Sequence, residues 1–258
     1  MREENVEFGG LKGKKMKGVF LYPDDEKPPG IMMVHGFGGE GLSPYWIDTA
    51  KDLCKKGFCV FTFLFSGYND LPDMRDVGIM DEVREMKIAM NFFQKKTGRK
   101  NFFVFAQSLG SFVSVITNDR RVKAYSLLAF NPRLKDSISR VLFTDEMVKK
   151  LENGENCEIK SISTGQLRVI GPKFWKDLKK FGNISEKNTG KVKKPVLLLW
   201  GTKDEYTSPE EAVEIYEMFG EPKKIFMLEG APHVTFREAG QRKIVLEEVR
   251  KWFDNYDS

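Results

Sequence analysis

Hydrophobic residues follow two alternating patterns along most of the chain. Short uninterrupted apolar runs, bounded by glycine, proline or polar turns, are typical of strands buried on both faces of a sheet. An N-terminal β-ribbon is expected first, with strands at residues 6–8 and 16–21 around the Gly9-Gly10 turn. Buried strands are then predicted at residues 31–34, 58–65, 101–106, 123–130, 195–200 and 224–228.

The segments between these strands carry apolar residues at helical spacing, with residues that start and stop helices. Ser43-Pro44 starts a helix that ends at Gly57, and a helix over about residues 78–96 has its stop at Gly98. Further helices are predicted at residues 111–118, 208–219 and about 238–253. Strands that alternate with helices in this way predict an α/β fold: a doubly wound, mostly parallel β-sheet with helices on both faces.

The segment from residue 133 to residue 191 interrupts this alternation. It is polar, lacks a long apolar strand, and carries predicted helices at residues 144–151 and 172–181. We therefore expect residues 1–132 and 192–258 to form the core, and residues 133–191 to form a small cap insertion over the C-terminal edge of the sheet. Binding sites of open α/β sheets lie at that edge.

The composition and charge of the chain limit the kinds of molecule that we expect it to bind. Hydrophobic residues make up 41% of the 258, enough for a full core, and the net charge of +5 is spread among interleaved acidic residues. Without a basic stripe or a recognised motif, we expect no nucleic-acid partner. The charged start MREENVEF has no apolar signal region, and no apolar run is long enough to cross a bilayer. We therefore expect a cytoplasmic protein with no membrane partner.

Cysteine usage gives no sign of a disulfide framework or a metal site. The three cysteines are odd in number and lack the CxxC spacing of zinc ligands: Cys54, Cys59 and Cys157. We expect buried free thiols and no metal.

The segment Ala106-Gln107-Ser108-Leu109-Gly110 places a serine between a predicted buried strand and a predicted helix. A serine hydroxyl is a weak nucleophile unless it is presented openly to a base. Small residues on both sides permit a sharp strand–turn–helix, which exposes the hydroxyl and sets the Leu109 amide at a helix N-terminus, where it can stabilise an oxyanion. Ser108 is the candidate nucleophile, and the alternative is a serine that only caps the helix.

Two histidines are available as the base that such a serine needs. His233 follows the predicted strand 224–228 in a loop with glycine and proline, and is the candidate general base. His35 precedes a glycine-rich loop and is expected to be structural, tying that loop to neighbouring backbone. Within the loop the amide of Phe37 is the second candidate oxyanion donor, with a simple flexible connection as the alternative.

A Ser-His pair is usually completed by an acid that orients the imidazole and stabilises its charged form. Asp204 lies directly after the predicted strand 195–200 and is the candidate. Its neighbour Glu205 is the rival, and a carboxylate elsewhere in the chain is a second alternative.

These motifs together resemble the α/β-hydrolase family, whose chain order of nucleophile, acid and histidine is also the order here. Within it the chain looks most like compact esterases of the cinnamoyl/feruloyl type and related dienelactone-hydrolase or peptidase-like members. The residues that carry the resemblance are His35-Gly36-Phe37-Gly38-Gly39, Phe65-Ser66-Gly67-Tyr68, Gln107-Ser108-Leu109-Gly110, Gly201-Thr202-Lys203-Asp204 and Pro232-His233. Two features depart from the family pattern: Ala106 stands where the serine motif usually has glycine, and the loop at residues 65–68 lacks the Arg-Gly-His form of relatives.

The resemblance implies a small cap over Ser108, with Phe174 and Trp175 as candidate substrate-pocket residues. Phe143 and Phe181 are further candidates, and for each aromatic the alternative is packing of the cap onto the core. It also implies a serine hydrolase that cleaves carboxylic esters of small molecules and needs no metal or organic cofactor. A thioesterase, a small-peptide or amide hydrolase, and a binding protein with an idle triad remain alternatives, and the oligomeric state stays open.

Overall fold

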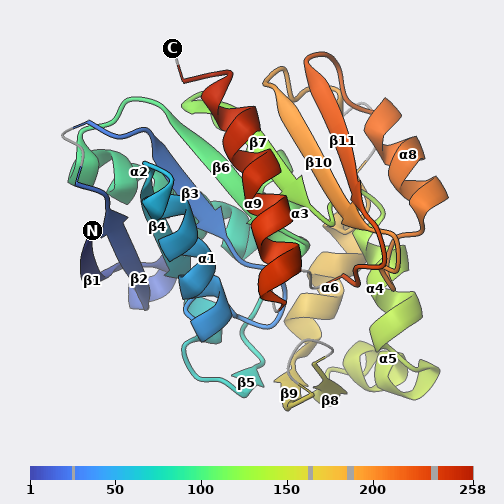
Figure 1. Ribbon diagram of the computed structural model, residues 1–258. Helices are drawn as coiled ribbons and strands as arrows, with labels where there is room; N and C mark the ends of the chain where they lie inside the picture. Colours follow the sequence, from blue (N-terminus) through green and yellow to red (C-terminus); the bar gives the residue numbers. More distant parts are fainter. Residues whose placement is uncertain (25–26, 162–164, 185–188, 234–237, 258) are drawn as a thin grey trace.

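The computed structural model describes residues 1–24, 27–161, 165–184, 189–233 and 238–257 (Figure 1). They form one eight-stranded sheet in the order β1-β2-β4-β3-β6-β7-β10-β11. The strands are β1 (Arg2–Gly9), β2 (Lys15–Tyr22), β3 (Gly30–Val34), β4 (Cys59–Leu64), β6 (Phe102–Gln107), β7 (Val122–Leu128), β10 (Val196–Gly201) and β11 (Lys223–Leu228). β1 and β2 form an antiparallel edge, and β2 runs antiparallel to β4. The remaining strands of this sheet run parallel to one another, in the order β4, β3, β6, β7, β10 and β11.

The apolar runs of the sequence become the central strands. Every residue of β3, β4, β6 and β10 is buried, as expected for strands covered on both faces. The sequence-based boundaries of the core strands after the ribbon differ from the observed ones by two residues at most, because the turns that end each run are clear in the sequence.

Helices cover both faces of the sheet. α1 (Pro44–Lys55) and α9 (Ala239–Asp254) pack side by side on one face, in front of the sheet in Figure 1. α2 (Ile79–Thr97) and α3 (Leu109–Thr117) contact each other on the opposite face, and α8 (Pro209–Glu217) packs against β10 and β11. The fold is therefore the expected doubly wound α/β arrangement.

Helix ends follow the signals in the sequence. α2 stops where Gly98 adopts a left-handed conformation (φ 70°) and its amide bonds the Gln94 carbonyl. α8 starts with a capping box, in which the Ser208 hydroxyl accepts from the Glu211 amide and the Glu211 carboxylate accepts from the Ser208 amide.

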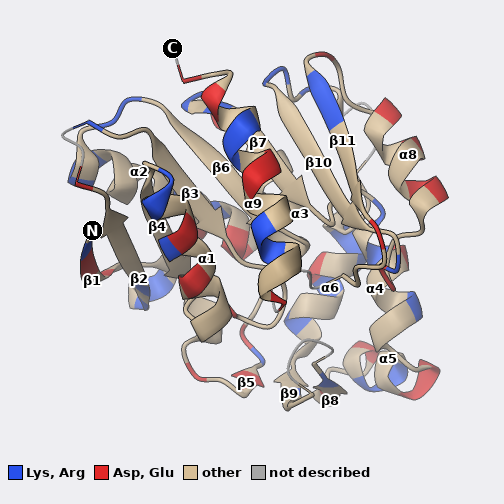
Figure 2. Cartoon of the chain, viewed as in Figure 1, with Lys and Arg blue, Asp and Glu red and all other residues tan. Residues whose placement is uncertain are grey.

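Charges of both signs are interspersed over the helices on the face drawn in Figure 2. Ion pairs link α1 and the residue that caps its C-terminus to α9: Lys56 Nζ lies 2.9 Å from Glu247, and Arg242 Nε lies 3.2 Å from Asp52. None of the helices in the described ranges combines the length and apolarity needed to cross a bilayer.

The segment between β7 and β10 holds more structure than its sequence predicts. The two predicted helices are present as α5 (Asp145–Glu152) and α6 (Pro172–Phe181). Three elements were not predicted: α4 (Leu134–Leu142), β8 (Cys157–Lys160) and β9 (Leu167–Ile170). β9 lies between β8 and β5 (Asp73–Met74) and pairs with both, and β5 lies in a stretch expected to be an irregular loop. Strands of two to four residues offer too few positions for a pattern to appear.

Gly201, at the end of β10, sits against the loop that follows β11. A Cβ at this position would lie 2.0 Å from the Ala231 carbonyl oxygen, closer than any side chain tolerates. The absence of a side chain lets the two loops meet, and the Lys203 amide bonds the same Ala231 oxygen at 2.9 Å. This contact sets the spacing between Asp204 and His233.

Gly201→Ala should lower the free energy of unfolding by about 2–3 kcal/mol, because the new methyl group forces the two loops apart. Gly240→Ala is the matched control: a Cβ there meets nothing within 4 Å, and its helical position favours alanine by up to about 1 kcal/mol. Urea unfolding of both variants measures the difference. Equal stability of the two would show that the close approach is not a constraint.

Candidate active site

Ser108 occupies the single residue between β6 and α3. Its backbone lies at φ 52° and ψ −121°, a region that L-residues rarely adopt. The turn is held by the Ser108 amide, which donates to the Leu128 carbonyl of β7 at 2.8 Å. Such strain persists only where the surrounding structure enforces it, and here it points the hydroxyl away from the helix.

Gly110 explains why α3 can start so close to the sheet. A Cβ on Gly110 would lie 2.4 Å from the His35 carbonyl oxygen and 2.6 Å from that of Val34. The first turn of α3 therefore packs directly on the end of β3. This contact brings Ser108 next to the glycine-rich loop that begins after His35.

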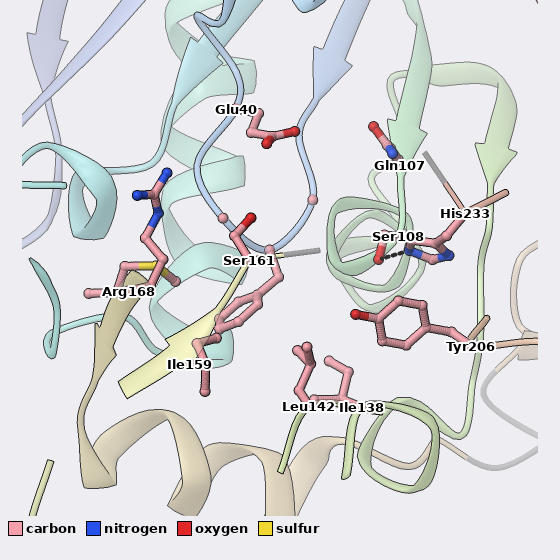
Figure 3. Close-up of a pocket in the computed structure, with 14 residues that line it drawn as sticks. Glu40, Gln107, Ser108, Ile138, Leu142, Ile159, Ser161, Arg168, Tyr206 and His233 are labelled. Atoms are coloured by element: carbon pink, nitrogen blue, oxygen red, sulfur yellow. Dashed lines mark hydrogen bonds between the residues drawn. The ribbon is translucent and has the colours of Figure 1, made fainter. Parts of the chain in front are cut away.

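His233 connects Ser108 to Asp204. Its Nε2 lies 2.9 Å from Ser108 Oγ, and its Nδ1 lies 2.7 Å from Asp204 Oδ2 (Figure 3). A carboxylate only accepts hydrogen bonds, so Nδ1 carries the proton and Nε2 is free to accept one from the serine hydroxyl. The three side chains singled out in the sequence thus form one continuous chain of hydrogen bonds.

The adjacent acids Asp204 and Glu205 have different positions. The Asp204 side chain is fully buried, and its second oxygen accepts from the amides of Tyr206 and Thr207 at 2.8 and 3.1 Å. The Glu205 carboxylate instead accepts from the His233 backbone amide at 3.0 Å. The Asp204 carboxylate therefore contacts the imidazole of His233, whereas the Glu205 carboxylate contacts the backbone of the same residue.

His35 lies buried beneath the glycine-rich loop. Its Nδ1 donates to the Gly36 carbonyl at 2.8 Å, and its Nε2 accepts from the Phe65 amide at 3.2 Å. Burial lowers the pKa of His35 to about 4, so the ring is neutral near pH 7. It ties the loop to the backbone after β4, as the sequence suggested.

The two candidate oxyanion donors border Ser108. Leu109 is the first residue of α3, where a helix amide has no partner within the helix and carries the positive end of the helix dipole. No described group accepts a hydrogen bond from the Phe37 amide, and Phe37 lines the same cavity as Ser108. Both amides are thus available to a ligand oxygen.

A narrow cavity of about 60 Å³ opens beside Ser108. Its walls come from the glycine-rich loop, from β5 and from the segment 133–191 (Figure 3). Its apolar lining is Phe37, Met74, Ile138, Leu142, Ile159 and Tyr206, and its polar lining includes Glu40, Gln107, Ser161 and Arg168. Within the described chain, no group of three or more His, Cys, Asp or Glu residues could hold a metal ion.

The aromatic residues proposed for the pocket lie elsewhere. Phe174 is fully buried and stacks on Phe37 with ring centroids 4.5 Å apart, behind the cavity wall. Trp175 packs edge-on against Phe143 at 5.4 Å. Neither Phe174 nor Trp175 is among the described residues that line the cavity: Phe174 packs the segment 133–191 against the glycine-rich loop, and Trp175 packs within that segment.

Several residues that line the cavity were not predicted, because the sequence carries only weak signals for them. Ile138 and Leu142 lie one helical turn apart on α4. Because this helix was not predicted, the sequence did not indicate that the two side chains lie on the same face. Tyr206 lies two residues after Asp204, and its ring lies 4.4 Å from that of His233. Proximity to the candidate acid was the one available indication.

No family model matches the chain, and no curated protein matches its sequence. Solved structures match it over nearly its whole length. The esterase domain of a Rhodothermus marinus protein has a TM-score of 0.74 at 19% identity over 99% of both chains. Est1E from Butyrivibrio proteoclasticus gives 0.75 at 18% over 98% of both, and a thermostable carboxyl esterase from Bacillus coagulans gives 0.79 at 14% over 99% of both. The similarity establishes that the chain has the α/β-hydrolase fold.

The neutral His35 makes stability depend on pH. Its pKa is about 4 when folded and near 6.5 when unfolded, so protons favour the unfolded state as the pH falls from 6.5 toward 4. The stability advantage of the wild type over His35→Gln should therefore shrink by about 2 kcal/mol between pH 7 and pH 4.5. Urea unfolding at both pH values measures it. A constant difference would contradict a neutral buried imidazole.

Proposed function

We propose that this protein is a serine hydrolase that cleaves carboxylic esters of small molecules through a covalent acyl-enzyme. The observation that carries the proposal is the continuous hydrogen-bonded chain from Ser108 through His233 to Asp204. It stands where the parallel strands end, beside a cavity, and such an arrangement supplies a nucleophile with its base and its orienting acid.

In the proposed first step, Ser108 Oγ attacks the ester carbonyl carbon while His233 Nε2 takes the hydroxyl proton. Asp204 keeps the imidazole in the required tautomer and stabilises its positive charge. The bond to the alcohol oxygen then breaks, and the alcohol leaves with the proton held on Nε2. Water attacks the acyl-enzyme in the second step, giving its proton to His233, which returns it to Ser108 Oγ as the acid departs.

The amides of Phe37 and Leu109 are proposed to bind the oxyanion of each tetrahedral intermediate. Because both belong to rigid backbone, they need no rearrangement when the charge develops. The buried His35 fixes the loop that presents Phe37.

The shape of the cavity favours small esters over peptides. A peptide substrate needs an open polar groove, whereas this cavity is narrow and much of its wall is aliphatic or aromatic. The esterases among the structures with the same fold add support to ester hydrolysis.

The wild type should hydrolyse p-nitrophenyl acetate or butyrate, and Ser108→Ala should abolish this activity because no nucleophile remains. Release of p-nitrophenolate is the measurement, and a fluorophosphonate probe should label the wild type at Ser108. Absence of both hydrolysis and labelling in the wild type would contradict the proposal and favour a binding protein with an idle triad.

Asp204→Asn should lower kcat by about 10³–10⁴, because the amide no longer holds the imidazole in the productive tautomer. Glu205→Gln is the matched control and should cost about tenfold or less, since the Glu205 carboxylate accepts from the His233 backbone amide and forms no hydrogen bond with the imidazole. Steady-state kinetics on one p-nitrophenyl ester compares the two. A larger loss in Glu205→Gln than in Asp204→Asn would assign the orienting role to the rival acid.

A further inference from the structure

Arg168 is a buried cation in the wall of the cavity. It lies on β9, and only 6% of the residue is exposed. Its Nη1 donates to the Gln166 side chain at 2.9 Å and to the Leu167 carbonyl at 3.4 Å, both neutral acceptors close to it in the chain. Its Nε is buried and has no hydrogen-bond partner among the described residues.

The charge of Arg168 has no counter-charge among the described residues around it. Within the described ranges, no carboxylate forms an ion pair with Arg168. Glu40 lines the same cavity but forms no ion pair or hydrogen bond with Arg168; its interaction is with another residue. A guanidinium withdrawn from water without a counter-charge costs stability, and its five N–H donors match the two oxygens of a carboxylate.

The position of Arg168 indicates where such an anion would bind. Arg168 and Ser108 both line the cavity, and Figure 3 shows them at opposite ends of it. The wall between them includes the aliphatic side chains of Ile138, Leu142 and Ile159. The cavity thus offers a nucleophile at one end, an apolar middle and an unpaired guanidinium at the other end.

We propose that Arg168 is a specificity-determining residue that binds a carboxylate on the substrate, remote from the ester bond that Ser108 cleaves. The substrate class is then an ester with an apolar chain ending in a carboxylate. This inference rests on the proposed function and adds the chemistry of the far end of the substrate.

The first test compares anionic esters with their neutral counterparts. The mono-p-nitrophenyl esters of adipic and suberic acid carry the carboxylate on the acyl chain, and their methyl esters lack its charge. A second series places the carboxylate on the alcohol part of the ester: the butyrate ester of 6-hydroxyhexanoate carries the charge, and the butyrate ester of methyl 6-hydroxyhexanoate lacks it. In one of these series the wild type should show a kcat/KM about 10- to 100-fold higher for the anion, as expected of a charged hydrogen-bonded pair.

Arg168→Gln should remove this preference by lowering kcat/KM for the anionic esters about 10- to 100-fold, to the level of the neutral esters, because the glutamine carries no charge. Arg168→Lys should retain part of the preference. Arg84→Gln, which alters an exposed arginine of α2 paired with Asp81, is the matched control and should behave as the wild type. Equal rates for anionic and neutral esters in both series of the wild type would overturn the proposal, as would an equal loss on both in Arg168→Gln.

A binding measurement separates this inference from the proposed function. Calorimetry with Ser108→Ala and monomethyl suberate should show binding that weakens about 10-fold or more when Arg168→Gln is added. Binding of this kind by a protein without esterase activity would leave the carboxylate site standing and contradict the hydrolase. Esterase activity with no carboxylate preference and no Arg168-dependent binding would contradict the carboxylate site alone.

Discussion

The packing of α3 directly onto the end of β3 is the constraint on which the candidate site depends. It is possible only because Gly110 has no side chain to meet the Val34 and His35 carbonyls. The same contact forces the positive φ of Ser108, brings its hydroxyl to the glycine-rich loop and aims the N-terminus of α3 at the space between them. One close approach of backbone to backbone therefore positions Ser108 together with the amides that are proposed to bind the oxyanion.

The two histidines show how environment divides one residue type between two roles. Both rings carry their proton on Nδ1 and accept at Nε2. His35 accepts from an amide that cannot give up its proton, and burial disfavours its charged form more than the hydrogen bond to the neutral Gly36 carbonyl favours it. His233 accepts from a hydroxyl and donates to a carboxylate. Only His233 can take up a proton and find its charge compensated.

The core and its hydrogen-bonded chain were predictable from sequence because both depend on local signals. Continuous apolar runs mark buried strands, and a serine between small residues marks a sharp turn after one of them. The walls of the cavity were not predictable, since they depend on pairing between distant segments, such as Asp73 with Val169. The size and apolarity of Phe174 predict burial but not the direction of the side chain, and its ring stacks behind Phe37 rather than facing the substrate space.

In the proposed function, the catalytic residues and the residues that select the substrate come from different parts of the chain. Ser108, Asp204 and His233 follow core strands, whereas Ile138, Leu142, Ile159 and Arg168 come from the segment 133–191. Ser108 and Arg168 are among the described residues that give up local stability, the first through its strained backbone and the second through a buried charge. Both border the same cavity, at its opposite ends. The packing of the fold does not explain why Ser108 is strained or why the Arg168 charge is buried. A single substrate molecule in that cavity would explain both, because it would react at Ser108 and pair its carboxylate with Arg168.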